Sequence, residues 1–334
     1  MSFDTNETAS SLLSGFTIQN GTTGGFFQAG GILVSNASPT IANNVITKNF
    51  GCGIGVYFGA PVIQNNTVSN TLDGGCGPGG GSGILLYGQG TQYGLGSVQI
   101  IGNVIVHNTS YLGDGAGIYL WIGGAPLIEN NIIAFNHSGY SGGGITMQNS
   151  GAPVIVQNLI VGNSAASVGG GLDLEIPNDG SYAIVVNNTI VNNAVGDNSS
   201  QMETEVYVSG FFGSVAFWNN IISSTTRGVL VFCDPSYGAP SPSFNNNDAF
   251  NPIGDDYMGT CAGETGKNGN ISANPLFVSN RNLELRAKSP AINAGSNSAP
   301  NLPTTDFGGN PRIVGGVVDI GAYEYQGNYS LASH

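Results

Sequence analysis

The chain has 334 residues, of which only 8% are charged, and its 20 acidic and 7 basic side chains give a formal net charge of −13. This balance argues against nucleic acid or an anionic membrane surface as a partner, because both would repel an acidic protein. The chain is long enough to bury a substantial core, and no apolar run is long enough to span a bilayer.

A repeat centred on a doubled asparagine occupies most of the chain. Its copies are SPTIANNVITKN (38–49), APVIQNNTVSN (60–70), VQIIGNVIVHN (98–108), APLIENNIIAFN (125–136), APVIVQNLIVGN (152–163), AIVVNNTIVNN (183–193) and VAFWNNIISS (215–224). Each copy is preceded by a segment of the form Gly-Φ-x-Φ, in which Φ is apolar. Successive copies are 22 to 37 residues apart. This spacing is too variable for a helical repeat, but it fits constant strands joined by loops of different length.

The physical interpretation of the repeat is a coil of three short strands. Both segments alternate with period two and are rich in β-branched residues, as strands are. An asparagine at a fixed turn tolerates the left-handed conformation, and its amide can bond to the same asparagine one coil away, about 4.8 Å distant. No segment keeps a 3.6-residue apolar period, and the 54 glycines would break helices.

The unit x-I-x-N-N-x-I-x-x-N after G-I-x-Φ resembles the right-handed parallel β-helix repeat of the pectate-lyase-like superfamily. The resemblance covers residues 10–250, about eight coils, and implies an all-β parallel β-helix domain over residues 1–250. It implies little about function, because lyases, hydrolases, esterases and adhesins share this scaffold.

Beyond residue 250 the repeat stops. The segments NPLFVSNRNLELRAKSPAINAG (274–295), DFGGNPR (306–312) and DIGAYE (319–324) resemble the C-terminal module of many secreted bacterial β-helix proteins. This resemblance implies a loop-rich capping module over residues 251–334 and a secreted or cell-surface location in a bacterium. We expect Arg312 to form a charge cluster with the acidic residues of these segments, and we expect the module to cover the open end of the solenoid.

The cysteine count also points to an oxidising compartment. The four cysteines contain no CxxC pair and have no histidine cluster beside them, so a zinc site is not expected. Three pairings are possible, and we expect the local one, Cys52–Cys76 with Cys233–Cys261.

Stacking the Gly-Φ-x-Φ segments places two columns of side chains on the outer face of one sheet, with neighbours about 4.8 Å apart. One column contains Tyr57, Tyr87, Trp121, Gln148 and Glu175, and the other contains Tyr119 and Asp173. Aromatic rings stack on the C–H faces of sugars, and carboxylates supply a general acid and base. In the superfamily that the repeat resembles, this sheet commonly forms the floor of the substrate groove.

Asp173 and Glu175 lie two residues apart on one strand, so their Cα atoms should be about 6.5 Å apart, a spacing compatible with an inverting glycosidase. Their mutual repulsion should raise one pKa, as a general acid requires. The predicted catalytic residues are Asp173, Glu175, Asp197 and Glu203. The predicted substrate-binding residues are Tyr57, Tyr87, Tyr119, Trp121, Gln148, His137, Tyr140 and Asp114.

The leading hypothesis is a monomeric, extracellular glycoside hydrolase that cleaves a neutral or weakly charged polysaccharide without a required cofactor. The carboxylate pair could instead bind calcium or only increase solubility, and aromatic stacks also arise because like residues pack along the solenoid axis. A polysaccharide lyase is disfavoured, because Lys48 and Arg227 are the only basic residues in the coils. A non-catalytic adhesin or glycan-binding protein is the remaining alternative.

Overall fold

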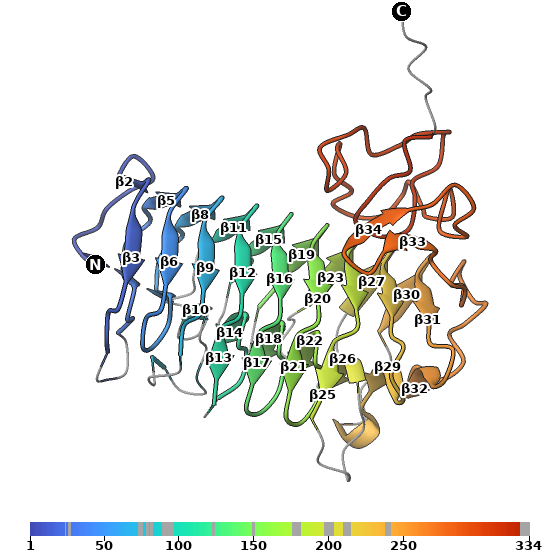
Figure 1. Cartoon of the computed structure of the whole chain (residues 1–334), viewed down its shortest axis with the longest axis horizontal. Coiled ribbons are helices and arrows are strands. Elements are labelled where there is room, and N and C mark those ends of the chain that lie inside the picture. The colour runs from blue at the N-terminus through green and yellow to red at the C-terminus, as the bar shows by residue number, and fades with distance from the viewer. Residues whose placement is uncertain are drawn as a thin grey trace, which may run out of the picture.

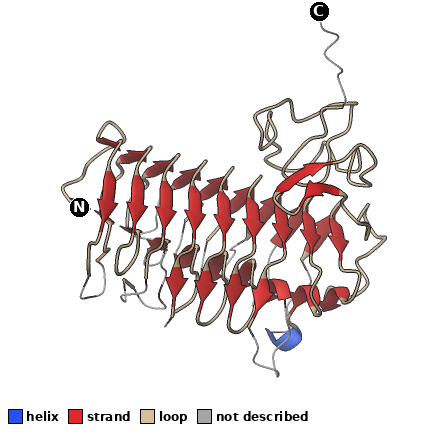
Figure 2. Ribbon diagram, viewed as in Figure 1, coloured by secondary structure: helices blue, strands red, loops and turns tan. Residues whose placement is uncertain are grey.

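The computed structural model describes residues 1–23, 25, 28–72, 76, 77, 80, 83–88, 97–111, 113–121, 124–148, 151–175, 182–196, 204–209, 215–237 and 242–327. Within these residues the chain forms a right-handed parallel β-solenoid, in which successive coils add strands to three long sheets (Figures 1 and 2). The all-β parallel β-helix expected from the repeat is therefore confirmed.

Each long sheet takes one strand from nearly every coil. Sheet A contains β1 (Ser2–Phe3), β4 (Ile32–Ser35), β7 (Ile54–Tyr57), β10 (Ile84–Tyr87), β14 (Ile118–Trp121), β18 (Ile145–Gln148), β22 (Leu172–Glu175), β26 (Thr204–Ser209), β29 (Val229–Cys233) and β32 (Asp255–Gly259). Sheet B contains β2 (Leu12–Ser14), β5 (Thr40–Ala42), β8 (Val62–Gln64), β11 (Gln99–Ile101), β15 (Leu127–Glu129), β19 (Val154–Val156), β23 (Ala183–Val186), β27 (Val215–Trp218) and β30 (Ser243–Asn245). Sheet C contains β3 (Thr17–Gln19), β6 (Val45–Thr47), β9 (Thr67–Ser69), β12 (Val104–Val106), β16 (Ile132–Ala134), β20 (Leu159–Val161), β24 (Thr189–Val191), β28 (Ile221–Ser223) and β31 (Asp248–Phe250).

Three smaller elements complete the described chain. The middle coils carry a fourth short sheet, sheet D, of β13 (Thr109–Ser110), β17 (His137–Ser138), β21 (Ser164–Ala165) and β25 (Ala194–Val195), which the repeat did not predict. A 3-10 helix, η1, spans Pro235–Tyr237, and an antiparallel hairpin joins β33 (Phe277–Ser279) to β34 (Asn282–Leu285).

The doubled asparagine forms the corner between sheets B and C, and its two residues have different roles. The first, such as Asn65 with φ of 54°, takes the left-handed conformation that turns the chain. The second, such as Asn66, is buried and donates from its backbone N–H and its Nδ2 to Oδ1 of the next asparagine, Asn103, at 2.9 and 3.1 Å. At three corners a glycine, Gly15, Gly102 or Gly269, stands in place of the first asparagine, as the left-handed conformation allows.

These buried side chains form one continuous ladder along the axis. Its members are Asn44, Asn66, Asn103, Asn131, Asn158, Asn188, Asn220, Asn247 and Asn270. Because Asn270 belongs to it and Asp248 pairs with Ile271, the coil pattern extends about 20 residues beyond the boundary expected at residue 250.

A second ladder lies at the corner between sheets C and D and ends on a carboxylate. Asn108, Asn136, Asn163 and Asn193 repeat the same bonds, and Asn193 donates from its backbone N–H and its Nδ2 to Oε2 of Glu205 at 2.9 and 2.8 Å. Glu205 is buried, and burial raises its pKa to about 8. Its side chain therefore reaches in from sheet A and replaces a further asparagine.

The core inside the coils is apolar and becomes aromatic towards the C-terminal end. Isoleucine, valine and leucine fill most inward positions. In the last coils Phe217 stacks on Phe244 with ring centroids 4.9 Å apart, and Tyr257 meets Phe244 edge-on at 5.2 Å. The cysteines pair as expected, Cys52 with Cys76 and Cys233 with Cys261. No helix in the described chain is long and apolar enough to cross a membrane.

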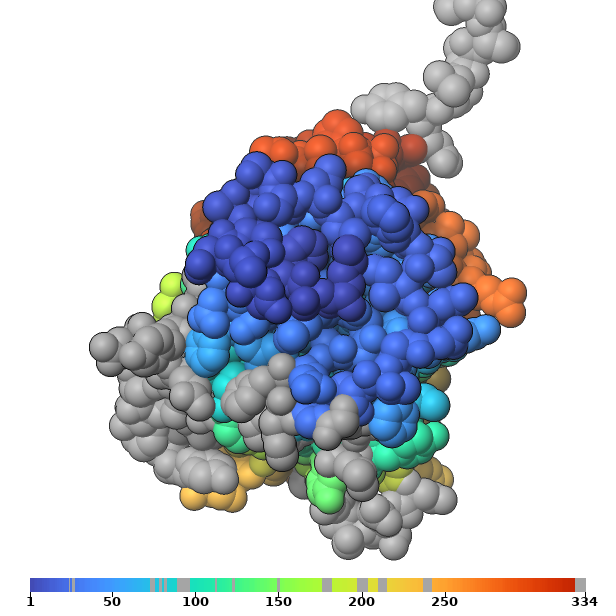
Figure 3. All heavy atoms as spheres, turned by 90° about the vertical axis from the view of Figure 1, so that its left-hand side faces the viewer, coloured from blue at the N-terminus to red at the C-terminus, as the bar shows by residue number. Residues whose placement is uncertain are grey.

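The C-terminal module packs on the flank of the solenoid instead of over its open end (Figures 1 and 3). The corner asparagines Asn187, Asn219 and Asn246 donate through Nδ2 to backbone carbonyls of the module. Leu283 and Ala322 of the module join a cluster with buried residues of sheet C. The module therefore docks on outer faces near the corner between sheets B and C.

The ladder predicts a sharp contrast between adjacent asparagines at one corner. Asn66→Ala should lower the free energy of unfolding by about 3 kcal/mol, because it removes the acceptor of the buried Asn44 backbone N–H and the side-chain donor to Ile41 O and Asn103 Oδ1. Asn65→Gly, at the exposed left-handed position, should change it by less than about 1 kcal/mol. Urea unfolding of both variants measures the difference, and equal effects would contradict the proposed division of roles.

Candidate functional site

The outer face of sheet A has the two side-chain columns that the sequence predicts. Tyr57, Tyr87, Trp121, Gln148, Glu175 and Ser209 pair in register from β7 to β26. Gly55, Leu85, Tyr119, Thr146, Asp173 and Tyr207 form the second column. On β29 the register differs from the expected one by two residues, because Tyr207 pairs with Phe232 and not with Leu230.

The aromatic part of these columns is covered. Tyr57, Tyr87 and Tyr119 are 1%, 7% and 0% exposed and form an apolar cluster outside the sheet with the Cys52–Cys76 disulfide. The Tyr57 hydroxyl donates to the carbonyl oxygen of Cys76. A sugar ring could reach these three tyrosines only if the covering segments moved. Trp121, which meets Tyr119 edge-on at 6.1 Å, is the partly exposed ring of the four predicted.

Asp173 lies beneath glycine-rich turns and is fully buried. A Cβ on Gly169 would lie 2.9 Å from the Asp173 Cβ, and one on Gly142 would lie 3.2 Å from it, so two turns pass directly over this side chain. Both glycines have φ near 63°, which L side chains rarely adopt. Neither carboxylate oxygen of Asp173 has a hydrogen-bond partner in the described structure. This is a costly arrangement for a charged group.

Two further carboxylates and an amide surround this rung. Gln148, on the preceding strand, accepts a bond from the Tyr119 hydroxyl at 2.7 Å and donates to Asp114 Oδ2 at 3.2 Å. Asp114 also accepts a bond from the Ser141 backbone N–H at 2.8 Å. Glu175, on the same strand as Asp173, and Asp114 are partly exposed. The predicted residues Asp114, Tyr119, Gln148, Asp173 and Glu175 therefore come together in one site.

The electrostatics of this acidic site favour protonation. Burial, with repulsion from Glu175 and Asp114, raises the pKa of Asp173 well above its ordinary value. Burial and the charge of Asp114 likewise raise the pKa of Glu175, against a hydrogen bond from Gln148. Burial raises the pKa of Asp114 despite its two donors. None of these carboxylates forms an ion pair, since the ion pair between described side chains is Lys267–Glu264.

Two aromatic residues on the strands that follow β22, Tyr207 and Phe232, border the acidic site, although the sequence analysis did not assign them to it. Tyr207 is the neighbour of Asp173 on the next strand, and its hydroxyl donates to Asp234. Its ring stacks on Phe232 with centroids 5.9 Å apart, and both rings are partly exposed. The signal that could have found this pair was the aromatic residue in each strand, but the assumed Gly-Φ-x-Φ register put Leu230 in place of Phe232.

His137 lies in β17 of sheet D, and Tyr140 follows on the segment that leads from β17 back to sheet A. His137 is exposed and contacts Ser164 Oγ through Nδ1 at 2.9 Å, and Tyr140 is 55% exposed. Tyr140 immediately precedes Ser141, the donor to Asp114, so its segment adjoins the acidic site. The other predicted catalytic residues, Asp197 and Glu203, lie outside the described residues.

In the part of the chain that the structure describes, no group of three or more His, Cys, Asp or Glu side chains is arranged to hold a metal ion. Calcium binding with oxygens from the remaining loops therefore stays a prediction.

A comparison with protein families matches residues 2–124 and 30–270 to the right-handed β-helix region. The chain belongs to this family. The match spans the coils of the right-handed β-helix and stops at residue 270, before the β33–β34 hairpin. No curated protein matches the chain. The family covers the scaffold and names no reaction, so the acidic site has to be interpreted from its own chemistry.

Because Asp173 is buried, replacing it with its neutral isostere, asparagine, should stabilise the protein by an amount that depends on pH. A carboxyl whose pKa is raised by folding contributes stability at low pH, and this contribution is lost as the pH rises through the folded-state value. Asp173→Asn should therefore melt at least about 3 °C above the unsubstituted protein at pH 8, with a smaller difference at pH 5.

Thermal unfolding followed by circular dichroism at several pH values measures this difference. The matched control is Asp255→Asn on β32, which makes the same chemical change at an exposed side chain and so relieves no burial of a carboxyl. A gain for Asp173→Asn that grew as the pH fell would contradict a buried carboxyl with a raised pKa.

Proposed function

We propose that the protein is an extracellular glycoside hydrolase that cleaves a neutral polysaccharide at the acidic site on sheet A. The observation that carries this proposal is that Asp114 and Glu175 lie close to Asp173 on the outer face of sheet A, and that the buried carboxylate of Asp173 has no hydrogen-bond partner among the described residues. Fully buried carboxylates are rare without partners, and groups with strongly perturbed pKa values cluster at catalytic sites.

Two of the carboxyls can reach a substrate without rearrangement. Glu175 is partly exposed and its pKa is raised, so it is suited to donate a proton to the glycosidic oxygen. Asp114, also partly exposed, is the partner that would activate a water molecule as the general base. Burial and the charge of Asp114 raise the pKa of Glu175 and so favour the protonated form of the acid, whereas Asp173 is buried and its own raised pKa favours its neutral form.

The chemistry of the site also limits the substrate. Three carboxylates without a basic partner would repel a uronic acid polymer, so a neutral sugar chain is favoured. Trp121 lies two strands before Glu175, and Tyr207 and Phe232 lie one and two strands after Asp173. These partly exposed rings border the acidic site on both sides and could stack on sugar units of one chain. The likeness of the coils to pectate-lyase-like proteins fits an extracellular polysaccharide substrate, as do the two disulfides.

A polysaccharide lyase fits the site poorly, because β-elimination needs a base and positive charge to neutralise the uronate. A glycan-binding protein without activity is the stronger alternative, since the same rings would serve it. This alternative predicts that the protein still binds the polysaccharide after the carboxylates of the acidic site are replaced.

The proposal predicts that Glu175→Gln lowers kcat about 10³-fold, because an amide cannot donate the proton that the leaving group needs. Asp114→Asn should have an effect of similar size, because it removes the base. In the unsubstituted protein, activity should fall as the pH rises past the raised pKa of Glu175. Reducing-end release from a panel of neutral polysaccharides measures all three.

Glu129→Gln is the matched control, because Glu129 is a partly buried carboxylate with a raised pKa on β15 of sheet B, away from the acidic site. It should retain full activity. Cleavage that is undiminished in Glu175→Gln, or absent for every polysaccharide tested, would refute the hydrolase proposal.

A further inference from the structure

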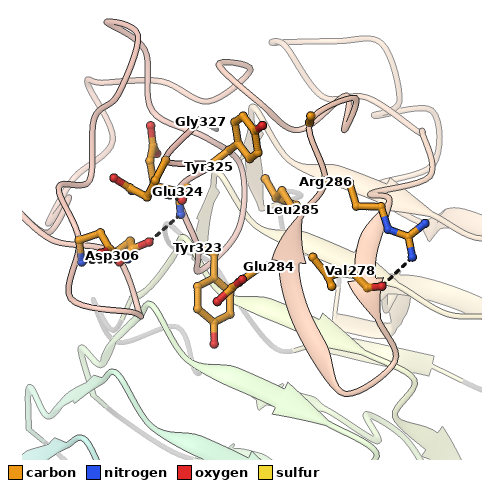
Figure 4. Close-up of a pocket in the computed structure, with 12 residues that line it drawn as sticks. Val278, Glu284, Leu285, Arg286, Asp306, Tyr323, Glu324, Tyr325 and Gly327 are labelled. Carbon is orange, nitrogen blue, oxygen red and sulfur yellow. Dashed lines mark hydrogen bonds between the residues drawn. The ribbon is translucent and has the colours of Figure 1, made fainter. Parts of the chain in front are cut away.

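The C-terminal module contains a pocket of about 500 Å³ that the acidic site does not involve (Figure 4). Its size is within the usual range for sites that bind small molecules. One wall comes from the β33–β34 hairpin and the residues after it, including Glu284 and Ala287. Asp306 is on the opposite side in Figure 4, and Tyr323 and Tyr325 line the pocket from the last described segment.

The segment that carries the two tyrosines is held in place by a buried polar cluster. Arg312 is 1% exposed and donates to the carbonyl oxygens of Ala322, Asp319 and Gly321. The Glu324 backbone N–H donates to Asp306 Oδ2 at 3.1 Å, as Figure 4 shows, and the Tyr325 N–H donates to Asp319 Oδ2 at 2.6 Å. The expected charge cluster is therefore present, but Arg312 bonds to carbonyls while the carboxylates accept from backbone N–H groups. The tyrosines are preorganised by these bonds.

The lining of the pocket combines ring faces with excess negative charge. Glu284, Asp306 and Glu324 provide three carboxyls against the single guanidinium of Arg286, which donates to the Val278 carbonyl oxygen at 2.6 Å. Burial and the charges of Glu284 and Asp306 raise the pKa of Tyr323, so the ring lies in a negative potential. An anionic ligand would be repelled. A ligand with many hydroxyl donors and with C–H faces to stack on tyrosine would fit.

We infer that this pocket binds a neutral sugar unit of a polysaccharide, with Tyr323 and Tyr325 stacking on the sugar and Glu284 accepting from its hydroxyls. The pocket and the acidic site lie on different faces, because the module docks near the corner of sheets B and C (Figure 1). Binding at the module would therefore tether the protein to a glycan and leave sheet A free. This inference does not depend on the proposed hydrolase activity.

The test measures binding to the full chain by isothermal titration calorimetry. The chain carries Glu175→Gln, so that the proposed hydrolase activity does not consume the probe. The neutral probes are cellohexaose, xylohexaose, mannohexaose and chitohexaose, with hexagalacturonate as the anionic probe and hexalysine as a cationic peptide. We expect at least one neutral hexasaccharide to bind with a Kd at or below about 1 mM. Ala287→Trp, which fills the pocket from an exposed wall position, should weaken this binding at least tenfold, and so should Glu284→Gln.

The matched control is Ile313→Trp, because Ile313 is an exposed residue of the same module that does not line the pocket. It should leave the affinity unchanged, and equal thermal midpoints would show that all variants fold. The inference is overturned if no neutral probe binds, if Ala287→Trp binds the sugar as well as its parent, or if hexalysine is the ligand that Ala287→Trp excludes. Hydrolysis by the protein with Glu175 intact is measured separately, so inactivity there would refute the proposed function alone.

Discussion

The hydrogen bonds between buried asparagines at the corner of sheets B and C fix the geometry on which everything else depends. Each corner side chain satisfies the backbone and amide of its neighbour, so every coil must stop at the same height and angle as the one before it. Insertions of very different length in the loops leave this corner unchanged. Side chains at equivalent positions are therefore aligned into columns along the axis. This alignment places Gln148 beside Glu175.

The same corner also explains the position of the C-terminal module. The asparagine that turns the chain needs no partner inside the coil, so its amide points outwards. At Asn187, Asn219 and Asn246 this amide binds carbonyls of the module. The expectation that the module would cover the open end rested on the general need to protect strand edges. The structure instead places it on a row of outward amides and an apolar flank, which no count of repeats could have indicated.

The sequence was sufficient to predict the coils, the ladder and most of the alignment of the sheet A columns, because these follow from local periodicity. The two disulfides were predicted on a different ground, as the most local of three possible pairings. The sequence could not predict which outward residues are covered. Tyr119 and Trp121 alternate with the core identically, yet one is buried and the other partly exposed, because burial is decided by long loops outside the repeat. For the same reason, periodicity did not reveal that Asp173 lies beneath two glycine turns. The register at β29 was missed because Gly228 lies two residues before the position equivalent to the usual glycine, and Leu230 occupies that position instead.

Several acidic groups of the folded chain are held in environments that favour the neutral form. Burial raises the pKa of Glu205 to about 8 and that of Asp248 and Glu324 to about 7. At neutral pH the folded protein therefore carries protons that the formal charge of −13 does not count. Unfolding releases those protons to the solvent. The heat that accompanies denaturation then includes the ionisation heat of whichever buffer takes them up, and the electrophoretic mobility of the native form reflects a smaller charge than its composition implies.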